Sequence, residues 1–243
     1  ENIKTLLTKL LKRSPISYGK YEASVNEIIA NVRENGDKAI FDLEKKFDKV
    51  DLTPANIRVT DEEIKEAYSK VDEKLLTVIR KSLKNIRSFH EKQKQNSWFT
   101  TDEKGIFLGQ KVTPVAIAGV YVPGGKAVYP SSVLMNIVPA KVAGVPRIVM
   151  CTPPGADGKV YPSTLVAAHE AGADEIYKVG GAQASASMAF GTESIPKVDK
   201  IVGPGNIYVA LAKKAVFGYV SIDSIAGPSE ILVLADETAN AHF

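Results

Sequence analysis

The feature that most constrains the fold is a regular alternation of short apolar segments with helical ones after about residue 106. The apolar segments lie at 147–151, 175–179, 200–202 and 231–235, and the helical ones at 133–143, 163–171, 182–190 and 207–216. Nearly uncharged strands separated by helices are typical of a parallel sheet covered on both faces. We therefore predict an α/β fold with a mostly parallel sheet, preceded by paired strands at 105–112 and 115–122.

The first 105 residues have a different character, because 39 of them are charged, against 20 of the following 138. Apolar residues recur at helical spacing at 25–32, before a stop at Asn35-Gly36, and again at 39–47 and 75–89. Thr60 and Glu63 form a capping-box pattern that opens a further helix. A helix is also expected at 3–12 and a short strand at 57–59. This predicts a helical N-terminal region with a boundary near 94–105.

Composition excludes several classes of protein. The 243 residues carry 31 basic and 28 acidic side chains, with the signs interspersed, which is a poor footprint for nucleic acid. No apolar run approaches the roughly 18 residues of a membrane span, and no signal peptide is visible at the first residues. The single cysteine, Cys151, cannot form an internal disulfide. We expect a cytoplasmic globular protein that binds neither membrane nor nucleic acid.

Glycine-rich turns lie where ligands bind in open parallel sheets, beyond the carboxyl ends of the strands. They occupy 119–125, 180–184, 203–206 and 226–230. The first three follow expected strands, and the second and third lead into helices whose N-terminal amides could approach a phosphate. Any one of them could be a plain turn, but three in one sheet favour a nucleotide ligand.

Familiar nucleotide motifs and catalytic groupings are missing from the sequence. There is no G-x-G-x-x-G after a strand, no P-loop, and no acidic residue after the strand that ends at Cys151. His90, His169 and His242 are far apart, so no local metal motif exists, and His169 is expected to be exposed. Cys151 closes a buried strand and is interpreted as a structural thiol. Glu230 could orient a ligand or cap a turn.

At these same turns the sequence resembles the histidinol dehydrogenase family. The segments that carry the resemblance are GVYVPGG at 119–125, YKVGGAQASASMAFG at 177–191, PKVDKIVGPGN at 196–206 and AGPSEILVLAD at 226–236. Several long matches in the right order make it specific, and the helical front is compatible with the family but less diagnostic.

The resemblance implies a reaction and a set of site residues. The family oxidises L-histidinol to L-histidine in two steps through L-histidinal, the last steps of histidine biosynthesis, using NAD and zinc. By resemblance, Tyr121, Gln183 and Asn206 line the NAD site and Ser229 contacts the substrate. These positions fall in the glycine-rich turns.

The resemblance also implies an architecture of Rossmann-like sheet domains assembled as a homodimer. Residues 121–229 would form the NAD-binding domain. Residues 1–120 would supply the helical segment and part of the other sheet domain, to which 230–243 return.

One departure from the family is large. Its zinc ligands and its Glu-His acid/base pair lie C-terminal to the segment matching 231–236, so their counterparts would lie beyond Phe243. We therefore expect no catalytic or metal-binding residue within the 243, and expect this part alone to be inactive. Two alternatives stay open: a related NAD-dependent dehydrogenase of another amino alcohol or sulfonate, and a short non-catalytic nucleotide-binding module.

Overall fold

The computed structural model describes residues 2–11, 19–124, 128–225, 231–240 and 242. Its core is a five-stranded sheet made of β3 (Ile117–Tyr121), β4 (Arg147–Cys151), β5 (Glu175–Tyr177), β6 (Lys200–Val202) and β7 (Ser221–Ile222). All four strand pairs are parallel, and the spatial order is β5-β4-β3-β6-β7. In chain order this is third, second, first, fourth, fifth, the arrangement of one Rossmann-type half extended by a strand. The predicted α/β class with a mostly parallel sheet is confirmed.

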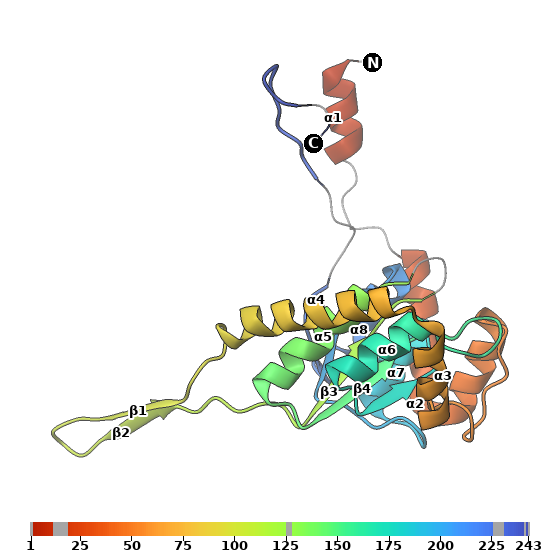
Figure 1. Ribbon diagram of the computed structural model, residues 1–243, viewed down its shortest axis with the longest axis horizontal. Helices are drawn as coiled ribbons and strands as arrows, with labels where there is room; N and C mark the ends of the chain where they lie inside the picture. Colours follow the sequence, from red (N-terminus) through yellow and green to blue (C-terminus); the bar gives the residue numbers. More distant parts are fainter. Residues whose placement is uncertain (1, 12–18, 125–127, 226–230, 241, 243) are drawn as a thin grey trace.

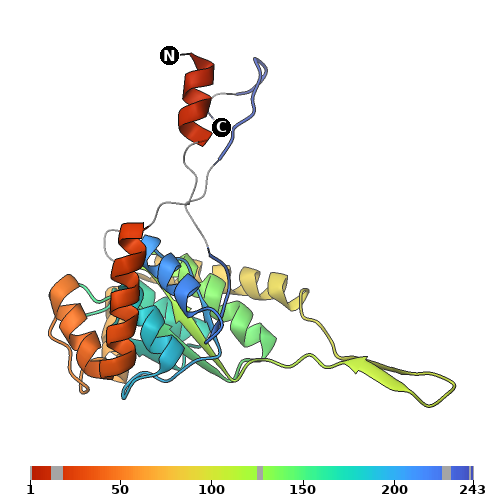
Figure 2. The same cartoon turned by 180° about the vertical axis from the view of Figure 1, so that it is seen from behind.

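Helices cover both faces of this sheet. The crossover helices are α5 (Pro130–Ala143), α6 (Pro162–Ala171), α7 (Gly181–Phe190) and α8 (Ile207–Val216). Figure 1 shows α5 and α6 in front of the sheet, and the reverse view in Figure 2 shows α7 and α8. Side chains of β3 alternate between the two apolar clusters that result, with Val120 packed in the α5–α6 cluster and Tyr121 in the α7–α8 cluster.

The N-terminal region is helical, as predicted. It contains α1 (Ile3–Leu11), α2 (Gly19–Phe47), α3 (Asp61–Lys70) and α4 (Glu73–Glu91). The predicted stop at Gly36 is a kink within α2, where the glycine takes φ 53° and ψ −133°. Helix α2 packs on α7 and α8, whereas α4 lies on α5 on the opposite face (Figures 1 and 2). The described helices include none long and apolar enough to cross a membrane.

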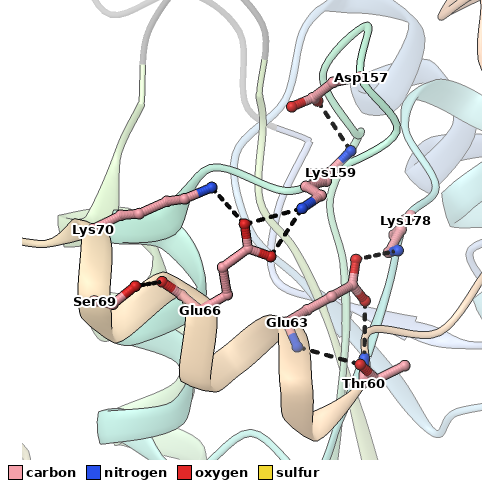
Figure 3. Close-up of polar contacts among 8 residues, drawn as sticks. All are labelled: Thr60, Glu63, Glu66, Ser69, Lys70, Asp157, Lys159 and Lys178. Atoms are coloured by element: carbon pink, nitrogen blue, oxygen red, sulfur yellow. Dashed lines mark hydrogen bonds and ion pairs between the residues drawn. The ribbon is translucent and has the colours of Figure 1, made fainter.

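The capping box at Thr60 is confirmed, and polar contacts join α3 to the sheet domain (Figure 3). The Glu63 amide donates to the Thr60 hydroxyl at 3.2 Å, and the Glu63 carboxylate pairs with Lys178 just after β5 at 2.5 Å. One turn on, Glu66 pairs with Lys70 at 2.6 Å and with Lys159 at 2.8 Å. Lys178 is buried, so loss of Glu63 would leave an uncompensated buried charge.

The expected pairing of 105–112 with 115–122 is wrong. Instead β1 (Trp98–Thr101) and β2 (Phe107–Gln110) form an antiparallel hairpin, while β3 lies between β4 and β6. The hairpin is favoured locally because the Asp102 carboxylate accepts the amides of Lys104 and Ile106, each at 2.9 Å. It projects away from the body of the molecule, with both strands exposed (Figures 1 and 2).

Two further strand predictions need correction. Residues 231–235 form no strand; the side chains of Ile231 and Leu234 are 90% and 94% exposed, and the described residues supply no neighbouring strand to pair with them. The segment 57–59 contributes a single antiparallel bridge, between Arg58 and Tyr177, in place of a strand.

Candidate functional site

A cavity of about 430 Å³ lies at the carboxyl edge of the sheet. It is at the switch point where the chain order reverses between β3 and β6, the usual ligand position in such sheets. Its described lining includes Asp48, Tyr121, Gly181, Gln183, Asn206 and Tyr208. The predicted cofactor residues Tyr121, Gln183 and Asn206 are therefore brought together around one cavity.

Tyr121 is the last residue of β3 and is buried. Its Oη accepts a hydrogen bond of 3.2 Å from the Gly181 amide. Burial raises the pKa of the Tyr121 phenol above its ordinary value, so the hydroxyl remains neutral and its proton is available to a ligand. The tyrosine thus joins the end of β3 to the start of α7.

Gln183 lies in the first turn of α7 and is buried. Its Nε2 donates to Glu44 Oε1 at 2.9 Å, and the Gly180 amide donates to the same oxygen at 3.0 Å. The hydrogen-bond ladder of the helix begins with Ala184 N donating to Gly180 O. The amides of 181–183 therefore have no partner within the helix; that of Gly181 donates to Tyr121, and those of Ala182 and Gln183, two residues that line the cavity, form a suitable N-terminus for an anion.

Asn206 is the N-cap of α8, and its Oδ1 accepts the amides of Tyr208 at 3.0 Å and Val209 at 3.2 Å. The turn before Asn206 is held in place by the ion pair of Lys213 and Asp223. Lys213 Nζ donates to Gly203 O at 2.8 Å and pairs with Asp223, which accepts the Gly203 amide at 2.9 Å. The glycine-rich turn at 203–206 is thus fixed by charge-assisted hydrogen bonds.

Two glycines that contact cavity-lining residues are required by their conformation. Gly181 has φ +58°, and a Cβ there would come within 2.8 Å of Gln183 Oε1. Gly203 has φ +119°, and a Cβ there would collide with the carbonyl oxygen of Tyr121. A side chain at either position would strain the backbone and disturb a residue that lines the cavity.

The electrostatics of the cavity come from acids on α2, which the sequence prediction missed. Burial raises the pKa of Glu44 from 4.5 to about 8, and the nearby negative charge of Asp48 adds to the shift. Burial likewise raises the pKa of Asp48, whose side chain lines the cavity. The sequence does carry a signal for them, because a charged residue stands within the buried stripe of α2, beside Ile40 and Leu43.

Of the other candidate residues, His90, His169 and Cys151 are not in the lining of this cavity. His90 contacts Gln93, and His169 is exposed, as predicted, and contacts Tyr68. Cys151 is buried and burial raises the pKa of its thiol, which agrees with a structural role. Ser229 and Glu230 lie outside the described residues. Within the described part of the chain, no group of three or more His, Cys, Asp or Glu side chains could hold a metal ion.

Comparison with known proteins connects this geometry to a family. The family model described as histidinol dehydrogenase matches residues 11–243. The chain belongs to the histidinol dehydrogenase family.

Individual members of the histidinol dehydrogenase family are similar over most of the chain. The histidinol dehydrogenase of Halalkalibacterium halodurans is 59% identical over 220 residues, which are 90% of this chain and 51% of that protein. The Clostridium acetobutylicum protein is 60% identical over 220 residues, with the same coverage. The chain therefore spans about half the length of the curated relatives it matches.

A solved structure agrees with the fold. The crystal structure of histidinol dehydrogenase from Elizabethkingia anophelis matches with a TM-score of 0.84 and 42% sequence identity. The match covers 90% of this chain and 50% of that one. The sheet and its covering helices are therefore those of a histidinol dehydrogenase.

Proposed function

We propose that this chain forms the NAD-binding part of an enzyme that oxidises L-histidinol to L-histidine through L-histidinal. The observation that carries the proposal is that Tyr121, Gln183 and Asn206 line one cavity at the switch point of the sheet. Membership of the histidinol dehydrogenase family supplies the substrate and the reaction class. The proposal places this biosynthetic step in the cytoplasm.

The residues at the cavity fit a dinucleotide. Its volume of about 430 Å³ lies within the range common for small-molecule sites, about 300–1,000 Å³. The described lining carries no Lys, Arg or His, so a diphosphate would be held by the amides at the start of α7 rather than by cationic side chains. NAD, when bound, would supply the hydride acceptor.

The chain's own residues would bind and orient the nucleotide. The neutral Tyr121 hydroxyl can donate a hydrogen bond, and the carboxamide of Gln183 can accept one while its Nε2 is engaged with Glu44. Gly181, which lines the cavity, leaves room beside the Gln183 carboxamide, and Gly203 leaves room for the Tyr121 carbonyl. Ser229 is proposed to contact the substrate.

Zinc is part of the proposed activity, but the described residues provide no set of side chains that could coordinate it. We place the zinc ligands and the Glu-His pair in the complete protein, beyond the segment matching 231–236. Residues 1–243 alone are then expected to bind NAD without oxidising histidinol.

Domain division and assembly are part of the same proposal. Residues 121–229, with the preceding part of β3, would form the NAD-binding domain; residues 1–120 would supply the helical segment and part of the other sheet domain, to which 230–243 return. A homodimer is supported by the exposed apolar hairpin, where Trp98, Phe99, Phe107 and Leu108 are each more than half exposed.

Calorimetric titration with NAD, followed by an assay of NADH formation with L-histidinol, tests the proposal. The complete protein should bind NAD and turn over L-histidinol, and Asn206→Ala should weaken NAD binding because it removes the cap of α8. Turnover of a different amino alcohol or a sulfonate in preference to L-histidinol would contradict the substrate. Binding of NAD that Asn206→Ala leaves unchanged would contradict the site.

A further inference from the structure

Glu44 is a buried acid that lies behind the cavity rather than in its wall. Its side chain is fully buried within the α2 surface that packs on α7, and it is not among the described residues that line the cavity. Oε1 accepts two hydrogen bonds, from Gly180 N at 3.0 Å and Gln183 Nε2 at 2.9 Å. Burying a carboxyl group costs free energy unless hydrogen bonds compensate for the lost water. The presence of this acid behind the cavity, with two hydrogen bonds to one oxygen, therefore calls for a specific explanation.

The contact determines which way the Gln183 carboxamide faces. Only the NH₂ group of a glutamine side chain can donate, so an acceptor at Glu44 Oε1 selects the orientation in which Nε2 is turned toward α2. Gln183 Oε1 then lies on the side of Gly181, 2.8 Å from the position a Cβ would take there. Both Gln183 and Gly181 line the cavity, so the acceptor oxygen lies on the side where a ligand would enter.

We propose that Glu44 is a positioning residue that holds the Gln183 carboxamide with its acceptor oxygen toward the cavity and fixes the Gly180–Gly181 turn. The charge on Glu44 then sets how strongly the cavity binds an anionic nucleotide. This inference rests on the proposed NAD-binding function and names the group that regulates it.

Asp48 is the neighbour whose titration interacts with that of Glu44, because its negative charge adds to the rise that burial causes in the pKa of Glu44, and burial raises the pKa of Asp48 as well. Four groups face Glu44. They are Asp48 just after the end of α2, Tyr121 on β3, Cys151 on β4 and the uncharged Gln183 on α7. Burial raises the pKa values of Tyr121 and Cys151, so both remain neutral in mildly alkaline solution. Glu44 Oε2 has no hydrogen-bond partner among the described residues, and the pKa of Glu44 is about 8.

Ionisation of Glu44 would place a buried negative charge behind the turn that receives the nucleotide. A charge about 10 Å from an anionic ligand, at an effective dielectric constant of about 20, changes affinity by about tenfold. NAD affinity should therefore fall by about that factor as the pH rises through the pKa of Glu44. The protonated acid and a glutamine have the same shape, so Glu44→Gln should bind as the neutral form does.

The test is calorimetric titration of the complete protein with NAD between about pH 7 and about pH 9, a range that brackets the pKa of Glu44. The wild type should lose about tenfold in affinity across the range, whereas Glu44→Gln should keep its affinity near the neutral-pH wild-type value throughout. Glu44→Ala should bind about tenfold more weakly at neutral pH, because Gln183 and the Gly180 amide lose their acceptor.

A second buried acid on α2 provides the matched control. Asp37 accepts hydrogen bonds from the amide and hydroxyl of Ser194, away from the cavity. Asp37→Asn should leave the pH dependence of NAD affinity as in the wild type.

The outcomes separate this inference from the proposed function. If the wild type binds NAD and Asn206→Ala weakens it, but Glu44→Gln keeps the wild-type pH profile, the inference about Glu44 is overturned alone. If the wild type does not bind NAD, the proposed function fails first. Should Glu44→Ala fail to fold, the Glu44→Gln profile still decides.

Discussion

Replacing Glu44 with glutamine should change how the stability of the protein depends on pH. The carboxyl of Glu44 ionises near pH 4.5 in the unfolded chain and near pH 8 in the folded one. Because the folded pKa is raised, the folded state holds a proton that the unfolded state releases between these values. The stability linked to this proton is fully present below pH 4.5 and is lost as the pH rises toward 8.

The size of the effect follows from linkage. Each pH unit within this window lowers the free energy of unfolding by about 1.4 kcal/mol for one proton. Between pH 5 and pH 7 the wild type should lose about 2–3 kcal/mol from Glu44, a loss that Glu44→Gln cannot show. The stability of the variant relative to the wild type should therefore rise by that amount over the same range.

Urea unfolding, followed by circular dichroism at several pH values, measures this difference directly. The comparison of two proteins that differ at one side chain cancels the titration of all groups that do not interact with Glu44. A difference in unfolding free energy that stays constant from pH 5 to pH 7 would refute the raised pKa and the reasoning built on it.

Three further changes test other parts of the structure. Gly203→Ala should lower the free energy of unfolding by about 1–3 kcal/mol and weaken NAD binding, because the φ of +119° and the Tyr121 carbonyl leave no room for a Cβ. Gly218→Ala is the control: its φ is +102° and no atom lies within 4 Å of the added Cβ, so NAD affinity should stay intact. Thr60→Ala should cost about 1 kcal/mol in thermal or urea unfolding, and an undiminished stability would contradict the role of the capping box. Phe99→Ser with Phe107→Ser, which removes the stacked aromatic pair of the hairpin, should convert the proposed dimer to monomers in light scattering, whereas an unchanged mass would place the interface elsewhere.

Local pattern predicted the elements of the sheet domain well. The bounds of β4, β6 and α8 agree with the sequence expectation residue for residue. Each is a short apolar run closed by a glycine, a proline or a capping residue, so the information that defines it is contiguous in the chain. Local pattern also located the glycine-rich turns at the strand ends, whereas the three predicted cofactor residues within them came from the family resemblance.

The errors concern contacts between distant segments. The partners of β3 lie about 30 and about 80 residues further along the chain, whereas the hairpin is set by a local aspartate turn. The segment 231–235 has the apolar pattern of a strand, but pattern alone does not provide a pairing partner. Glu44 contacts Gln183 across 139 residues of sequence, so its part in the site depends on how α2 packs on α7.

The central claim is that the cavity at the ends of β3, β5 and β6 binds NAD. The measurement that tests it most directly is a crystal structure of the complete protein with NAD. The account predicts a nucleotide in contact with Tyr121, Gln183 and Asn206, with its diphosphate at the start of α7. A nucleotide bound at any other edge of the sheet, with these three residues uncovered, would contradict it.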